Sequence, residues 1–478
     1  MKLTKTLLLG SAATLVVVAA AQAADLPTKK GAPAAEYVKV CKVGDIAGFV
    51  IPGSDTCLKI SGYVNAQIAM GNVKDEYTLA PYPAPLGGGA MALTSAAKNV
   101  NDIGYYTRGQ VNFDAVTNTA MGPLLAHIEL QGDSGDGRFD SNTGSGVVLN
   151  EGYVQWAGIT AGKHPSFYDY LAGGDTWKDF FSPDHSGTPI NLLAYTATFG
   201  GGFSATLSLE QNESVSGFAG SKFTVSTISS LVGTVAYGSI SGAPLGARSP
   251  DIVASLDVTQ TWGGAHLAGV AHNDRYAFTG SLAVSGAPVS SFESDVDTWG
   301  YGVIGGVTFN LPMLSAGSKI AFQGAYADGA IAYSGATSPG WGEQDQGFNT
   351  NGNGLLFPMA DGIFNPVTGS YEKSQAWSAA AQLTWKVSPN FEIDPEIAYA
   401  SVQYDSASAA LWSVSPKATA WWVGAVFDWS PVKNLDFALD AIYESSHQTT
   451  PAYWDAGNGP FQNNADGFNG RIHVVRSF

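Results

Sequence analysis

The sequence predicts an all-β fold, a 16-stranded antiparallel transmembrane β-barrel with short periplasmic turns, long extracellular loops and a third loop that folds inward. Three features of the 478-residue chain lead to this prediction. Apolar and polar residues alternate with a period of two, connections alternate between short and long, and aromatic residues gather beside the short connections. Together they indicate strands that face lipid on one side and water on the other.

The period-two alternation is clearest in three neighbouring segments, 391–400, 420–429 and 435–444. In each of them one set of alternate positions is apolar or aromatic, and the other set includes carboxylates. Strands of about 9–11 residues can cross a bilayer when they are tilted. The final segment, 468–478, also alternates and ends on Phe478. We expect Phe478 to face outward and its strand to pair with the first one.

The spacing of the strands distinguishes a membrane barrel from a soluble β-sandwich, whose strands also alternate. We expect strands at 56–70, 102–117, 123–133, 147–157, 158–170, 192–200, 203–210, 250–261, 265–273, 297–309, 319–328, 374–387, 391–404, 418–429, 435–445 and 468–478. Their connections are by turns short, as at 200–202, and long, as at 211–249. Outer-membrane barrels have short turns at one rim and long loops at the other, whereas a sandwich has no reason to sort its loops.

Aromatic residues mark the rim that has the short turns. They are Phe199, Phe203, Trp262, Phe309, Trp385, Phe391, Trp429, Phe437 and Phe478. An outward-facing aromatic girdle is typical of the membrane interface of such barrels. The aromatic residues of a soluble core would instead be spread along the strands.

The N-terminus has the features of an export signal. Lys2 and Lys5 precede an apolar stretch at 7–21, which ends in Ala-Gln-Ala at 21–23. This pattern predicts a cleaved secretory signal, with a buried N-terminal helix as the alternative. The expected segments are a signal peptide at 1–23, an N-terminal periplasmic or plug-side segment at 24–55 and the transmembrane barrel at 56–478.

The composition is unusual for a soluble protein. Charged residues make up 13% of the chain, about half of the usual share. Beyond the signal we find no run of about 18 apolar residues that could form a membrane-spanning helix. Such a chain can face lipid only as a closed barrel, in which every backbone group is paired. The formal net charge of −17 argues against nucleic acid as a partner.

A barrel of about 16 strands encloses a water-filled channel, and the long connection at 171–191 is the candidate to narrow it. We expect the loop to contribute Asp175, Lys178, Asp179 and Asp184. On the opposite wall we expect Lys59, Arg108, Lys163 and Arg471. Opposed charges across a constriction create a transverse field that filters polar solutes. The alternative for each residue is an ordinary solvated charge.

Cys41 and Cys57 are the two cysteines, and they flank a short stretch that contains Ile51-Pro52-Gly53. In an oxidising compartment an even, close pair predicts a disulfide, and two free thiols are the alternative. No histidine or carboxylate cluster supports a metal site at this pair, and the seven histidines are scattered. Because catalytic and phosphate-binding motifs are also missing, we expect no metal, no cofactor and no catalytic residues.

Two N-terminal stretches resemble the signature of the alphaproteobacterial general diffusion porins. They are Glu36-Tyr37-Val38-Lys39-Val40-Cys41 and the stretch from Phe49 to Val64, which holds the second cysteine. The signal ending and the terminal Phe478 are also similar. The middle of the chain matches only in layout, and it carries long insertions at 211–249 and 329–373.

The resemblance implies a homotrimer in the bacterial outer membrane, in contact with lipid and lipopolysaccharide. It implies passive diffusion of ions and small hydrophilic solutes, and a third loop, 171–191, that folds into the pore. It also implies insertion by the barrel-assembly machinery, for which Phe478 would be the signal. Trimer contacts are expected at the small outward residues Gly62, Val64, Ala66 and Gly109.

Two other functions remain open at this point. A solute-specific outer-membrane channel should show an ordered polar or aromatic track along its lumen. A barrel adhesin would act through its large loops, 211–249 and 329–373. An enzyme is not expected, because no nucleophile, base and orienting residue can be placed together on one rim.

Overall fold

The computed structural model describes residues 39–71, 76–83, 89–97, 103–137, 146–171, 183–185, 189–212, 236–284, 290–336, 360–365, 368–411, 415–450 and 463–478. The chain divides into two compact units, Met1–Val40 and Cys41–Phe478, and the second contains the barrel. Within the described part of the chain, no helix is long and apolar enough to cross a membrane.

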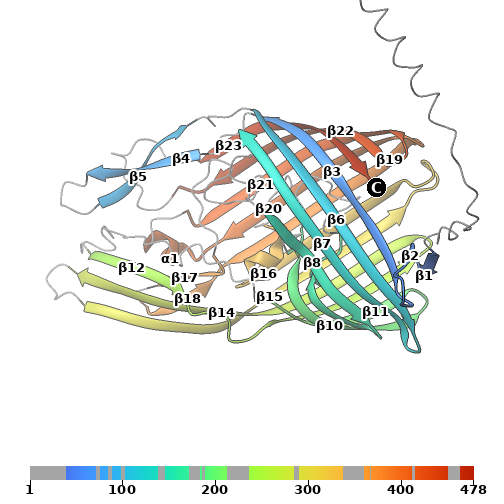
Figure 1. The fold of residues 1–478 in the computed structure, drawn as a ribbon. Helices are drawn as coiled ribbons and strands as arrows, with labels where there is room; N and C mark the ends of the chain where they lie inside the picture. The colour runs from blue at the N-terminus through green and yellow to red at the C-terminus, as the bar shows by residue number, and fades with distance from the viewer. Residues whose placement is uncertain are drawn as a thin grey trace, which may run out of the picture. The chain divides into compact units, whose positions relative to one another are not determined.

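Sixteen antiparallel strands form a closed barrel, as predicted, and lie side by side as long tilted strands (Figure 1). In chain order they are β3 (Cys57–Gly71), β6 (Ile103–Thr119), β7 (Gly122–Gly137), β8 (Val147–Trp156), β9 (Ile159–His164), β10 (Ile190–Gly200), β11 (Phe203–Glu210), β13 (Asp251–Gln260), β14 (Gly263–Val284), β15 (Ser290–Asn310), β16 (Lys319–Asp328), β19 (Gln375–Ser388), β20 (Phe391–Gln403), β21 (Lys417–Val432), β22 (Leu435–Gln448) and β23 (Asn464–Ser477). Short turns and long loops alternate between them, which confirms the predicted layout.

The barrel closes where the last strand pairs with the first. β23 runs antiparallel to β3 and ends with Ser477 opposite Tyr63. Beyond this pair, the Phe478 N–H donates to the Gly62 carbonyl at 2.9 Å, and the Gly62 N–H donates to the Phe478 carbonyl at 3.2 Å. The side chain of Phe478 is exposed on the outside of the barrel. The predicted closure through the last strand is therefore confirmed.

Two of the short turns have the left-handed backbone that two-residue hairpin loops require. Ala157 (φ 51°) and Gly158 (φ 87°) join β8 to β9, and Gly201 (φ 62°) and Gly202 (φ 80°) join β10 to β11. At Gly202 a Cβ atom would lie 1.9 Å from the carbonyl oxygen of Thr259. This turn therefore needs glycine for both its dihedral angles and its space.

The two faces of the barrel differ in the way expected for lipid outside and water inside. Eight of the nine predicted girdle residues are exposed, and Phe391 is half-exposed. Charged residues at alternate positions are buried instead, among them Asp394, Asp440 and Arg471. Because soluble proteins show the opposite distribution, the outer surface is suited to lipid.

One predicted strand is too long. The segment 158–170 was expected to be a strand throughout, but β9 ends at His164. Pro165 follows and cannot donate a hydrogen bond to the neighbouring strand. Ser166 and Phe167 then bond to the side chain of Glu210 instead of to a strand.

The long loops contain elements that the alternation did not predict. β4 (Glu76–Pro83) and β5 (Gly89–Ala97) form a hairpin, β12 (Ala236–Pro244) pairs with β14, and β17 (Gly362–Asn365) pairs with β18 (Ser370–Lys373). Two short helices lie among the described residues, η3 (Ile331–Ser334) and α1 (Ser406–Leu411). β14 and β15 are longer than expected because they continue as a paired ribbon beyond the predicted spans.

The N-terminal part of the barrel unit is joined to the wall by the predicted disulfide. Cys41 on β1 (Val40–Val43) is bonded to Cys57 on β3. β2 (Ile46–Val50) pairs with the start of β3. Cys57 is fully buried beside Val43 and Val116. The alternative of two free thiols is therefore wrong.

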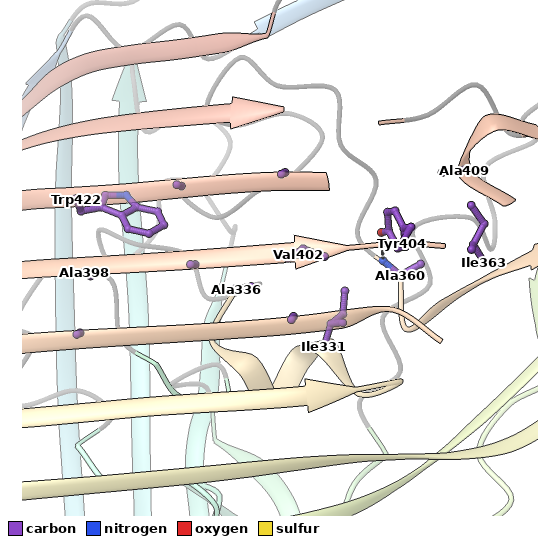
Figure 2. Packing of buried hydrophobic residues seen from close by; sticks show 14 of the residues in the cluster. Ile331, Ala336, Ala360, Ile363, Ala398, Val402, Tyr404, Ala409 and Trp422 are labelled. Atoms are coloured by element: carbon purple, nitrogen blue, oxygen red, sulfur yellow. Dashed lines mark hydrogen bonds between the residues drawn. The ribbon is translucent and has the colours of Figure 1, made fainter. Parts of the chain in front are cut away.

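The largest buried apolar cluster lies between loop 329–373 and the inner wall. It includes Ile331, Ala336 and Ile363 of the loop and Ala398 and Val402 of β20, all labelled in Figure 2. The inward positions of the wall are mostly small here: Ala376, Ala380, Ala398, Ala400, Ala418 and Ala420 are all buried. The small side chains leave room in which the described parts of the loop pack.

Deletion of Phe478 should reduce the yield of folded barrel. It removes both backbone hydrogen bonds to Gly62 at the closing seam, where an unpaired edge is most costly in lipid. The measurement is folding of purified protein into lipid vesicles, followed by the electrophoretic shift of the heat-resistant form. Phe478→Leu, which keeps the backbone pairing, should fold nearly as well. An unchanged yield after the deletion would contradict the role assigned to this seam.

Candidate pore constriction

Three of the predicted wall residues lie on adjacent strands at the closing seam. Lys59 is on β3, Arg108 is on β6 and Arg471 is on β23. In the register Arg471 lies opposite Ala69, and Arg108 lies opposite Asn65, both in the inward row of β3. We call these inward-facing positions of β23, β3 and β6 the seam wall.

Each cation of the seam wall has a carboxylate on a neighbouring strand. Arg108 donates to both oxygens of Asp133, at 2.8 and 3.1 Å. Arg471 Nε donates to Asp440 at 2.8 Å. The pairing fixes the guanidinium groups in position and balances their charge locally.

The three cations differ in how far solutes can reach them. The Arg471 side chain is only 4% exposed, so its ion pair mainly completes the wall. The side chains of Arg108 and Lys59 are 23% and 44% exposed. Lys59 is also only loosely paired, because its Nζ lies 4.0 Å from Asp114. Lys59 and Arg108 are therefore the cations that a solute in the lumen can meet.

A row of rings continues from the seam wall across β7, β8 and β9. His127 stacks on Tyr153 with ring centroids 4.8 Å apart, and Tyr153 meets His164 edge-on at 4.6 Å. His164 in turn stacks on Phe167 at 5.2 Å. All four side chains are partly exposed. We call these four residues the ring track.

Tyr168, just before loop 171–191, and Pro183, within it, bond to residues on the inside of the barrel. The Tyr168 hydroxyl donates to the Tyr333 carbonyl at 2.7 Å. Gln323 on β16 donates to the Pro183 carbonyl at 2.7 Å. His266 Nε2 on β14 lies 2.9 Å from the Tyr168 carbonyl. These contacts place the ends of the loop inside the barrel, in agreement with the predicted inward fold.

The attachment lies across the barrel from the seam wall. Counted from β3, β14 is the ninth of the sixteen barrel strands, and β15 and β16 follow it. A strand eight places away in a closed ring of sixteen is diametrically opposite. The contacts of Tyr168 and Pro183 therefore lie on the wall that faces Lys59 and Arg108.

Two predicted residues are placed differently from the expectation. Asp184 is 1% exposed, and it lies beside Asp169 instead of facing the open lumen. Burial raises the pKa of Asp169, and the charge of Asp184 raises it further. Burial also lowers the pKa of the neighbouring His185 to about 4, so its ring is neutral at neutral pH.

The second correction concerns Lys163. In the register it lies opposite Gly152 and Asn191, in the row that alternates with Tyr153 and His164 and faces outward. Its ammonium group donates to the Leu149 carbonyl at 3.0 Å. The inward positions of β9 are the even-numbered ones, so Lys163 is on the outward face. The expectation that Lys163 lines the constriction is therefore wrong. Asp175, Lys178 and Asp179 lie outside the described residues.

The residues that hold the loop were not found in the sequence. Glu210, His266, Gln323 and Tyr333 are separated along the chain, and only the closed barrel brings them to one site. A weak signal existed, because three of them are polar residues at alternate positions of strands. The alternation of apolar and polar residues did not predict that loop 329–373 packs inward.

The closed barrel, the charged lumen and the loop folded into it define a channel-forming protein of the outer membrane. The chain belongs to the porin subfamily, which matches residues 25–468. It is 26% identical to porin Omp2b of Brucella canis over 409 residues, covering 83% of this chain and 92% of the relative. Omp2b of Brucella abortus is equally similar over the same shares.

A solved structure agrees with the fold. The outer membrane channel DcaP of Acinetobacter baumannii superimposes with a TM-score of 0.54 at 15% identity, and the match covers 91% of this chain and all of DcaP. At this identity the likeness concerns the fold alone. With the family match, it identifies the chain as an outer-membrane diffusion porin, a channel and a multi-pass β-barrel.

Tyr168→Phe should loosen loop 171–191 without unfolding the barrel. The change leaves the buried Tyr333 carbonyl without the hydroxyl that donates to it, which costs about 1–3 kcal/mol. Single-channel recordings should then show larger current fluctuations and a higher mean conductance. Tyr170→Phe is the matched control, because its hydroxyl makes only a 3.3 Å bond to Thr308. Equal traces for both variants would mean that the Tyr168 bond does not hold the loop.

Proposed function

We propose that ions and small hydrophilic solutes pass through a constriction between the seam wall and loop 171–191. The observation that carries this proposal is the contact of Tyr168 with β14 and of Pro183 with β16, on the wall opposite Lys59 and Arg108. Asp175, Lys178 and Asp179 are the loop charges proposed to face them.

The charge of the lumen supports a mild preference for cations. Acidic residues outnumber basic ones by 40 to 23 in the chain. Arg108 is neutralised by Asp133, and the inward row of β20 carries three carboxylates, Glu392, Asp394 and Glu396, of which Glu392 is paired with Lys386. A lumen with an acidic surplus raises the local concentration of cations. Size and charge would thus decide which solutes pass.

We also propose that the active form is a homotrimer. The outward row of β3 includes Gly62, Val64 and Ala66, and Gly109 lies beside Val64 on β6. Val64 is 48% exposed, and a Cβ at Gly109 would meet nothing within 4 Å. A small, smooth and apolar outer face of this kind allows close packing of a second subunit.

The remaining partners follow from the outer face and the chain ends. The exposed girdle would contact lipid and lipopolysaccharide, and the exposed Phe478 would be recognised by the barrel-assembly machinery. The signal peptide at 1–23 and the first part of the segment at 24–55, residues 24–38, lie outside the described residues. They stay predictions from the sequence.

Arg108→Gln should make the pore more selective for cations, because Asp133 loses its counter-charge. The measurement is the reversal potential in planar bilayers under a KCl gradient, where wild type should also insert with conductance steps in threes. Lys433→Gln is the matched control, because Lys433 lies exposed in the turn between β21 and β22. Its reversal potential should equal that of wild type.

Three results would contradict the proposal. Insertion without ion current would refute the channel. An unchanged reversal potential in Arg108→Gln would remove the seam wall from the constriction. The same result after replacing Asp175 and Asp179 with lysine, which should move selectivity toward anions, would remove loop 171–191.

The ring track favours a second candidate, a channel with preference for aromatic solutes. Four partly exposed rings, each in contact with the next, offer stacking surfaces to a planar solute. Tyr153→Leu should slow the entry of an aromatic acid into liposomes and leave that of a sugar of similar size unchanged. Tyr301→Leu, on the outer face, is the control. Equal slowing of both solutes would mean that the track only shapes the pore.

A further inference from the structure

One fully buried group of polar residues serves neither the pore nor the loop contacts described above. His272 and Asp274 project inward from β14, Asp361 belongs to loop 329–373, and Asp251 begins β13. None of the four has measurable exposure to solvent. Three carboxylates thus surround a single imidazole inside the protein.

The atoms of three of these residues converge as metal ligands do. His272 Nε2 lies 3.2 Å from Asp274 Oδ1 and 3.8 Å from Asp361 Oδ2. One ligand atom from each of the three residues lies within 4.8 Å of the ligand atoms of the other two. Donors bound tetrahedrally at about 2.0–2.1 Å lie about 3.3 Å from one another. The observed separations therefore bracket the value that a shared ion requires.

A second set of contacts orients the imidazole toward this point. His272 Nδ1 lies 2.9 Å from both oxygens of Asp251. Asp251 in turn accepts hydrogen bonds from the Tyr333 hydroxyl at 2.6 Å and from Asn212 at 2.9 Å. A carboxylate on the far nitrogen of a histidine fixes the tautomer and raises the basicity of the ligating nitrogen. The lone pair of Nε2 then points at Asp274 and Asp361.

An independent observation points to a ligand. Apart from the 3.2 Å contact with His272 Nε2, neither carboxylate oxygen of Asp274 has a hydrogen-bond partner among the described residues, although the side chain is completely buried. A buried carboxylate without hydrogen bonds is costly unless it is paired with charge or coordinates a metal. One imidazolium brings a single positive charge to three carboxylates, whereas a divalent ion brings two.

We propose that His272, Asp274 and Asp361 bind a divalent transition-metal ion, of which Zn²⁺ is the representative. A site with one imidazole and two carboxylates suits Zn²⁺, whereas Ca²⁺ and Mg²⁺ prefer oxygen ligands alone. The bound ion ties loop 329–373 to the barrel wall through Asp361. This site differs from the expectation of no metal. Because Asp361 lies far from His272 and Asp274 along the chain, no sequence motif predicted the three ligands together.

The test uses untagged full-length protein in detergent micelles, stripped with a chelator and titrated with Zn²⁺ by calorimetry. Metal content is then measured after gel filtration. We expect one Zn²⁺ per chain and no binding of Ca²⁺ or Mg²⁺ at the same concentrations. Co²⁺ should give visible d–d bands that Zn²⁺ abolishes. Thermal unfolding should shift upward with Zn²⁺, because the ion binds only the folded state.

Variants decide whether the assigned residues hold the ion. Asp274→Asn should abolish stoichiometric binding, and Asp251→Asn should weaken it by about 10–100-fold. Asp295→Asn, an exposed aspartate on β15, should bind as wild type does. If Asp274→Asn fails to fold, Asp361→Asn on the loop replaces it. Wild-type affinity in Asp274→Asn or Asp361→Asn, or no stoichiometric Zn²⁺ in the wild type, would overturn the site.

Discussion

The pairing of every backbone group within one closed sheet is the constraint on which the rest of this structure depends. In lipid no water can satisfy an unpaired N–H or C=O, so the edge strands β3 and β23 must bond to each other. Closure fixes the register, and a slip of one residue would turn each inward side chain outward. The positions of Lys59, Arg108 and Arg471 on one wall are therefore a consequence of how the ring closes.

The same rule governs the loops that enter the lumen. Peptide groups of the segment that follows β9 need partners when they leave water, and the wall supplies them at Phe167, Tyr168 and Pro183 through Glu210, His266 and Gln323. The described parts of loop 329–373 instead pack apolar side chains against a row of alanines on the wall. Polar and small wall residues are thus matched to the segment that each one receives.

The fold could be predicted from the sequence because its signal is local. Alternation in β20, β21 and β22 and the glycines of the short turns each operate within a few residues. The constriction could be predicted only in part, because its contacts join distant positions, such as Tyr168 and Tyr333. Lys163 was misplaced because the six residues of β9 are too few to show a parity. Asp184 was misplaced because burial inside a loop leaves no periodic trace.

The transverse field of the pore need not come from a loop alone. Arg471 and Asp440 are bonded across β23 and β22, and Arg108 and Asp133 are bonded across β6 and β7. On β20 three carboxylates, Glu392, Asp394 and Glu396, occupy alternate inward positions, and Glu392 is paired with Lys386. The places of these charges on the wall are set by the strand register. In the proposed channel, the wall therefore sets the sign of the charge that a solute meets.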